Sequence, residues 1–155
     1  MGKVLVSYFS ASGRTRRVAE ELATITNGDL FEIEPVEKYS NDDLNWSDPT
    51  SRSSIEMKDP TSRPAIKNKV TNIDEYDQVI IGFPVWWYTV PHIINSFIEE
   101  NDLNNKKIYV FATSGGSSVD DSFNNLKKDY NDLDFISSKT LNGDIDSLEI
   151  TNWIK

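Results

Sequence analysis

Three short, continuous apolar runs are the feature of this sequence that most restricts its fold. They are KVLVSYF at 3–9, QVIIGF at 78–83 and KIYVFAT at 107–113. A strand with one buried face alternates apolar and polar residues, whereas these runs do not, which is typical of strands buried on both faces in a parallel sheet. Weaker strand patterns at 29–35 and 133–141 bring the expected number of strands to five.

Helical patterns separate these strands. We expect the helices at 14–26, 91–100, 118–130 and 146–154. The last and shortest pattern is expected to pack Leu148, Ile150 and Trp153 against the sheet. Regular alternation of strand and helix predicts an α/β fold, with a doubly wound parallel sheet and helices on both of its faces. We expect a single domain over residues 1–155, which is a normal length for one domain.

In such a sheet, ligands bind at the carboxyl ends of the strands, where the strand order reverses. The loops that reach this edge are expected at 10–15, 35–72, 84–90 and 113–118. The segment 35–72 is long, polar and without clear periodicity, and loops of this length are usually functional or mobile.

The first of these loops, SASGRT, has the composition of a phosphate site. Ser10, Ser12 and Thr15 supply hydroxyl groups, Gly13 permits a close backbone approach, and the N–H groups of a helix start attract anions. Arginines within 14–17 would lie at the positive end of the helix, and a bound dianion would relieve that repulsion. The alternative is an ordinary capping turn with Ser10 or Ser12 as the N-cap.

Several other functional classes are excluded by inspection. Neither G-x-x-x-x-G-K-[ST] nor G-x-G-x-x-G occurs, which excludes the P-loop and the dinucleotide fingerprint. Without cysteine there can be no thiolate nucleophile and no cysteine-ligated cluster. A net charge of −9 argues against nucleic-acid binding. The same acidity serves either solubility or docking to a basic partner protein.

The loop after the third apolar run carries three consecutive aromatic residues, Trp86, Trp87 and Tyr88. They form either a stacking platform for a planar ring or a hydrophobic lid packed on segment 35–72. In TSGGSS, Gly115 and Gly116 let the backbone turn its polar groups toward a ligand edge. Phosphate loop, aromatic faces and backbone polar groups together indicate a phosphorylated planar heterocycle, most simply FMN.

These motifs resemble the flavodoxins, and more closely a bacterial flavodoxin-like subgroup. The likeness rests on SASGRT, YDQVIIGFPVWWYTVP and FATSGGSS, together with SRSSIE and TSRPAI in the polar segment, and it covers nearly the whole chain. It implies a sheet of order 2-1-3-4-5. It also implies that the FMN phosphate is bound by Ser10, Ala11, Ser12, Gly13, Arg14 and Thr15. The residues it places along the flavin ring are Pro84, Val85, Trp86 and Trp87, and those at the other ring edge are Thr113, Ser114, Gly115 and Gly116.

Tyr88 is the main departure from the subgroup, which often has a small residue at this position. We count Tyr88 among the cofactor-binding residues, since its bulk would affect access to the ring. His92 is the only histidine, and one imidazole makes no metal site. We expect neither a catalytic residue nor a metal.

The resemblance implies a low-potential one-electron carrier that shuttles electrons between redox enzymes. The alternative is an NAD(P)H-dependent FMN or quinone reductase of the same fold, and a third class is a flavin-binding regulatory module. For the carrier we expect a monomer whose acidic surface docks redox partner proteins, with no nucleic acid or membrane as partner. No signal peptide or bilayer-length apolar stretch is visible, so a cytoplasmic protein is expected.

Overall fold

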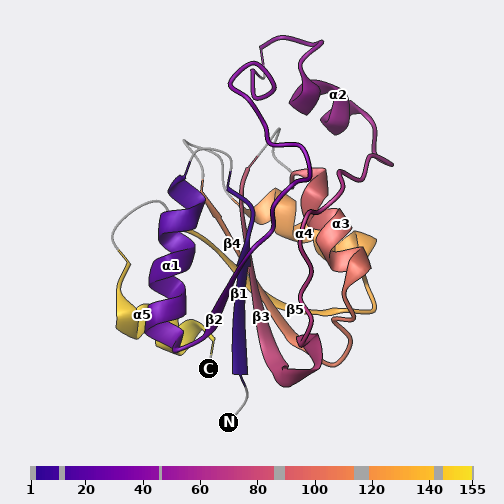
Figure 1. The fold of residues 1–155 in the computed structure, drawn as a ribbon. Helices are drawn as coiled ribbons and strands as arrows, with labels where there is room; N and C mark the ends of the chain where they lie inside the picture. Colours follow the sequence, from indigo (N-terminus) through magenta and orange to yellow (C-terminus); the bar gives the residue numbers. More distant parts are fainter. Residues whose placement is uncertain are drawn as a thin grey trace.

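The computed structural model describes residues 3–10, 13–45, 47–85, 90–113, 119–141 and 145–154. The strands are β1 (Lys3–Tyr8), β2 (Asp29–Glu32), β3 (Tyr76–Pro84), β4 (Lys107–Thr113) and β5 (Asp134–Thr140). The helices are α1 (Arg14–Thr26), α2 (Arg52–Lys58), α3 (His92–Glu100), α4 (Asp120–Asp129) and α5 (Ser147–Trp153), with one 3-10 turn, η1 (Ile73–Glu75) (Figure 1).

All five strands form one parallel sheet in the order β2-β1-β3-β4-β5. The predicted fold class and strand order are therefore confirmed. The three continuous apolar runs became the central strands β1, β3 and β4, because only central strands are covered on both faces. Strand order reverses between β1 and β3, and at their carboxyl ends the backbone N–H of Phe9 still donates to the Gly82 carbonyl (3.0 Å).

Helices cover both faces of the sheet, as Figure 1 shows. On one face, α1 and α5 pack against inward residues of the central strands, with Val18, Leu22 and Ile150 buried. On the other face, α3 and α4 bury Phe97 and Leu126 in the larger of the two cores. The polar segment 35–72, which we call the insert, first passes above the carboxyl end of the sheet and carries α2 there, and then runs down beside α3 toward the start of β3.

Two expectations were wrong. Leu148 is 67% exposed, because in the two turns of α5 the inward side is taken by Ile150 and Trp153, three residues apart, and Leu148 lies off that line. Helix α2 was not predicted, since most of its residues are polar and its seven residues give almost no periodicity. The signal that could have found it is Ser51, whose side chain caps the helix by accepting a hydrogen bond from the Ser54 N–H.

Candidate functional site

The carboxyl ends of β1, β3 and β4 meet at one edge and bring together the described residues of three predicted loops. Pro84 pairs with Thr113 in the sheet, and the Val85 N–H donates to the Thr113 carbonyl (3.1 Å). The Thr15 and Thr113 hydroxyls lie 2.7 Å apart. Of the predicted cofactor-binding residues, the structure thus places Pro84, Val85 and Thr113 beside the start of α1. The residues outside the described parts are Ala11, Ser12, Trp86, Trp87, Tyr88, Ser114, Gly115 and Gly116.

The start of α1 has the backbone geometry of an anion site. Gly13 adopts a left-handed conformation (φ 94°) directly before the right-handed helix, the combination that gathers N–H groups into an anion-binding nest. The first described bond of the helix runs from the Arg17 N–H to the Gly13 carbonyl, and the N–H groups of residues 14–16 have no acceptor among the described residues. A side chain built on Gly13 would meet no described atom within 4 Å, which leaves room in front of these groups.

Ser10 shows how far the capping alternative holds. Its hydroxyl accepts a hydrogen bond from the Gly13 N–H (2.9 Å), so it closes the turn before the helix. Gly13, however, is the N-cap residue, and it has no side chain with which to cap the helix. The hydroxyl of Ser10 therefore shapes the loop and, among the described residues, leaves the N–H groups of the first helical turn to a ligand. Ser12, the other candidate cap, lies outside the described residues.

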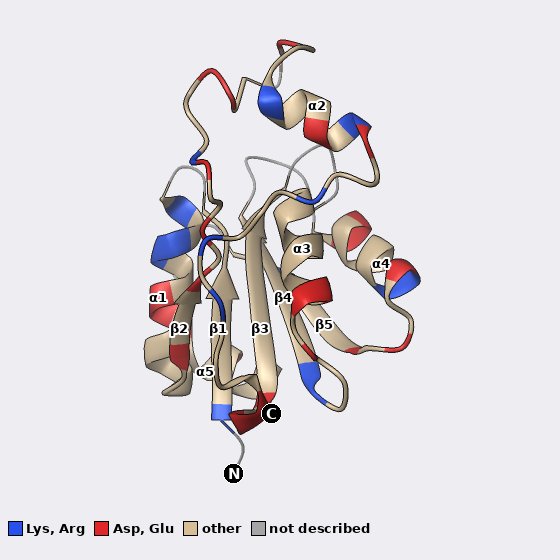
Figure 2. Cartoon of the chain, turned by 45° about the vertical axis from the view of Figure 1, so that its right-hand side comes forward, with Lys and Arg blue, Asp and Glu red and all other residues tan. Residues whose placement is uncertain are grey.

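Charge at this helix start also suits an anion. The first turn of α1 contains no acidic residue, and Arg14, Arg16 and Arg17 are all exposed there (Figure 2). Arg16 lies 3.9 Å from both Glu20 and Glu32, which offset part of its charge. The positive end of the helix dipole repels these three cations. A doubly charged phosphate bound there would instead be attracted both by the helix end and by the arginines.

Thr15 and Thr113 connect the start of α1 to the carboxyl end of β4. Both residues are almost completely buried, with 2% and 3% of their surface exposed. Because a hydroxyl can donate and accept at once, a bond between the two oxygens leaves further bonding capacity on the pair. The link holds the end of β4 at a fixed distance from the first turn of α1.

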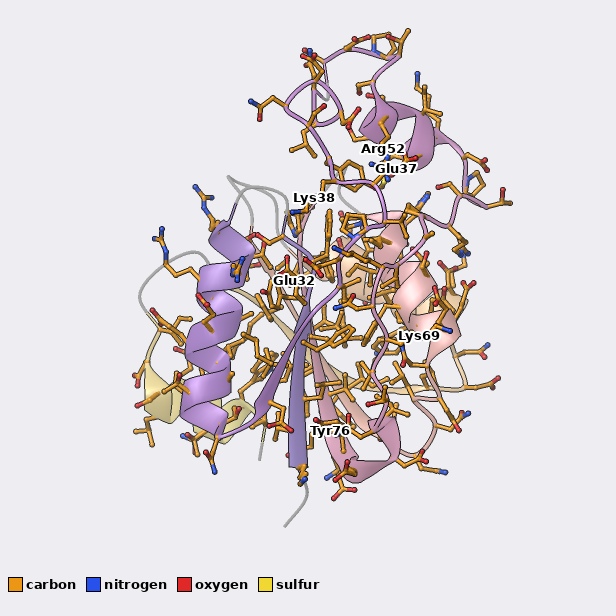
Figure 3. All side chains as sticks on the ribbon, viewed as in Figure 1. Glu32, Glu37, Lys38, Arg52, Lys69 and Tyr76 are labelled. Atoms are coloured by element: carbon orange, nitrogen blue, oxygen red, sulfur yellow. The ribbon has the colours of Figure 1, made fainter. Side chains whose placement is uncertain are left out.

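A cluster in the insert was missed by sequence reasoning. It consists of Tyr39, Arg52 and Glu56, and we call it the insert cluster. The Arg52 guanidinium lies 3.8 Å from the centre of the Tyr39 ring and bonds Glu56 Oε2 (2.9 Å), while the Tyr39 hydroxyl donates to Glu56 Oε1 (2.5 Å). Arg52 also donates to the Glu37 carbonyl (2.7 Å), as the neighbouring labels in Figure 3 indicate. The i, i+4 spacing of Arg52 and Glu56 was the available sequence signal.

The insert cluster fixes the insert at the carboxyl end of β1. The Tyr39 ring meets the edge of Phe9, the residue before Ser10, with 5.6 Å between ring centres. Burial, and then the adjacent Glu56, raise the pKa of the Tyr39 hydroxyl, so it stays a hydrogen-bond donor at neutral pH. An arginine stacked on a ring and bonded to a carboxylate is a strong contact for an otherwise polar segment.

Half-buried and exposed carboxylates in the insert make the surface above the site acidic. Hydrogen bonds from Ser40, Thr50 and Thr61 lower the pKa values of Asp43, Asp48 and Asp59 respectively. These carboxylates therefore stay charged well below neutral pH. Among the described residues, no three acidic or histidine side chains gather as a metal site would require, and no helix there is long and apolar enough to cross a bilayer.

Comparisons with known proteins agree with this architecture. A family model described as flavodoxin matches residues 3–155. A candidate flavoprotein from Bacteroides eggerthii is 49% identical, with a TM-score of 0.96 over 99% of this chain and 96% of its own. One from Bacteroides uniformis is 44% identical, with a TM-score of 0.93 over 99% and 97%.

A third solved structure is more distant in sequence. It is a flavoprotein from Lactobacillus acidophilus, solved in complex with FMN, and it shares the fold at 23% identity, with a TM-score of 0.78 over the full length of both chains. No curated protein sequence matches the chain.

Proposed function

Because this chain belongs to the flavodoxin family, we propose that it binds FMN and carries single electrons between larger redox enzymes. The observation that carries the proposal is the start of α1. There, N–H groups without an acceptor among the described residues, a left-handed Gly13 and three arginines form the proposed anion site, and Thr15 ties that site to the end of β4. The described residues fit a phosphate monoester, and the distant relative from Lactobacillus acidophilus holds FMN.

In this proposal different groups of the chain bind the phosphate and the ring of FMN. The N–H groups of residues 14–16 and the Thr15 hydroxyl hold the phosphate, while Pro84, Val85 and Thr113 border the ring. The aromatic residues Trp86, Trp87 and Tyr88 cover the ring face. Bound FMN would supply the one-electron chemistry, and the protein would set the potential through the surrounding charge.

The protein's charge favours a low potential. Full reduction of a bound flavin adds negative charge to a protein of net charge −9, which resists it. Acidic residues in the insert, above the proposed ring position, would repel the pyrophosphate of a nicotinamide cofactor and attract a basic partner protein. These two effects favour a carrier that a separate reductase reduces. We propose in addition that it acts as a monomer.

The deciding experiment separates the carrier from a reductase. The flavin is first released by acid and identified by chromatography as FMN or FAD. Flavin-loaded protein is then mixed anaerobically with NADH or NADPH, and the loss of flavin colour is followed. We expect slow bleaching that becomes fast on addition of a flavodoxin reductase. Bleaching within seconds by the nicotinamide alone would establish the reductase instead.

A matched pair of variants tests the acidic docking surface. Asp42→Lys changes the charge of the insert, and Asp77→Lys makes the same change at the opposite end of the sheet, where exposed Asp77 is the second residue of β3. Reduction by the added reductase should slow more for Asp42→Lys than for Asp77→Lys. Raising the salt to about 1 M, where charges are screened beyond about 3 Å, should remove that difference. Equal rates for the two variants at low salt would contradict docking through the insert.

A further inference from the structure

A cavity of about 420 Å³ lies between α3 and α4, close to the end of the loop that was predicted at 84–90. Its size falls in the usual range of small-molecule sites. Its buried wall is formed by Val90, Asn95 and Leu126. The rest of its lining is Pro60, Arg63, His92, Glu99, Asn125, Asp129 and Tyr130. Figure 2 shows α3 and α4 side by side on this face of the molecule.

The polar groups of the cavity form a chain that fixes the orientation of Asn95. Arg63 donates to both oxygens of Glu99 (3.1 and 3.0 Å), and the Tyr130 hydroxyl donates to the same carboxylate (2.5 Å). Burial and Glu99 raise the pKa of Tyr130 to about 12, so the hydroxyl keeps its proton. With that proton used on Glu99, the Tyr130 oxygen can only accept, and it accepts from Asn95 Nδ2 (3.1 Å).

The result is a buried acceptor without a donor. Asn95 is 6% exposed, and among the described residues its Oδ1 atom has no hydrogen-bond partner. The amide cannot turn round to relieve this, because Oδ1 would then face the lone pairs of the Tyr130 oxygen. A buried acceptor without a partner costs about 1–3 kcal/mol, so such groups are rare unless a ligand satisfies them.

His92 supplies a second acceptor one helical turn away. The Ser62 hydroxyl donates to the Glu56 carbonyl (2.8 Å) and lies 2.5 Å from His92 Nδ1. Since that hydroxyl has only one proton, Nδ1 must carry the ring hydrogen, and Nε2 keeps its lone pair. Burial, and then the charge of Arg63, lower the pKa of His92, so the ring is neutral at pH 7.

We propose that this cavity is a second binding site, for a small neutral ring compound with two hydroxyl donors. One hydroxyl would donate to Asn95 Oδ1 and the other to His92 Nε2, since residues three apart on a helix lie on one face, about 5–6 Å apart. The apolar side chains of Val90 and Leu126 suit the ring. Glu99 and Asp129 oppose an anion, and Arg63 opposes a cation.

Resorcinol and its dimethyl ether are the probes, because they share a ring and differ in the two donors. The chain has one histidine, so the ring nitrogens of His92 give a unique signal in ¹⁵N NMR of the flavin-loaded protein. Resorcinol should shift the Nε2 signal in a saturable way. The ether should need at least about tenfold higher concentration than resorcinol to give the same shift, because it cannot donate the one or two hydrogen bonds that resorcinol donates. Equal binding of both probes, or no response of His92, would overturn the proposal.

Two variants complete the test. Asn95→Leu should remove the preference for resorcinol, yet unfold at the same temperature as the wild type or higher, because it deletes the unpaired acceptor. Ser122→Ala removes the Ser122 hydroxyl, the other buried polar group without a described partner, which does not line the cavity, and this variant should keep the preference. If Asn95→Leu keeps the preference, or if Ser122→Ala loses it, the proposed site is wrong. The probe pair on the wild type decides the matter even where a variant does not fold.

Discussion

The contact between Thr15 and Thr113 allows a sharp test of how the anion site is held. Replacing either residue by valine keeps the shape of the side chain and removes one hydroxyl. Each single variant leaves the other hydroxyl buried without its partner, since the two residues are only 2% and 3% exposed. The expected loss is about 2 kcal/mol in the free energy of unfolding, within the range for a buried unpaired polar group.

The double variant Thr15→Val/Thr113→Val should recover most of this loss. Replacing both partners by apolar groups of the same shape is close to neutral, so the two single effects should not add. For a protein of 155 residues, a loss of about 2 kcal/mol lowers the melting temperature by roughly 4–8 °C. Thermal unfolding of the flavin-free protein would measure this for all four forms.

Additive losses in the double variant would refute the reasoning, because they would mean that the two hydroxyls act separately. A second readout concerns the ligand. Thr15→Val should weaken FMN binding more than riboflavin binding, since the Thr15 hydroxyl is proposed to bind the phosphate. Thr113→Val should weaken both ligands by similar factors, because Thr113 is proposed to border the ring, which FMN and riboflavin share. Loss of equal size for FMN and riboflavin in Thr15→Val would remove Thr15 from the phosphate site.

Three further predictions follow from the same structure. Gly13→Ala should lower the free energy of unfolding by about 1–2 kcal/mol, because Gly13 has a left-handed backbone (φ 94°) and not because an added side chain would clash. Asparagine adopts this backbone more readily than alanine, so Gly13→Asn should lose less stability in denaturant unfolding. Equal losses for the two variants would indicate a steric cause. His92 binds a proton near pH 6.5 in the unfolded chain but only at lower pH in the folded protein, so the free energy of unfolding should fall as the pH drops below about 6.5. At pH values above those at which the carboxyl groups titrate, His92→Gln should flatten this dependence of stability on pH. An unchanged dependence would contradict the lowered pKa of His92. Trp87→Ala should weaken FMN binding by up to about tenfold and raise the potential of the second one-electron reduction, and an unchanged potential in a redox titration would favour the hydrophobic-lid interpretation.

The sequence alone determined the sheet and the position in the chain of the proposed anion site. Continuous apolar runs can be satisfied only by strands covered on both faces, so β1, β3 and β4 were predicted within a few residues. The position of the phosphate loop follows as well, because a glycine and hydroxyl residues between a strand and a helix are adjacent along the chain. Both the strands and the position of the phosphate loop therefore depend on residues that are close together in the sequence.

Tertiary structure alone decided the contacts between distant segments. Tyr39, Arg52 and Glu56 form the insert cluster through one arrangement of a polar loop that gives no periodic signal. The unpaired oxygen of Asn95 depends on Tyr130, which lies 35 positions away in the sequence. Such contacts depend on how the side chains lie once the chain has packed. The pattern of hydrophobic residues in the sequence does not predict which polar groups form hydrogen bonds with one another.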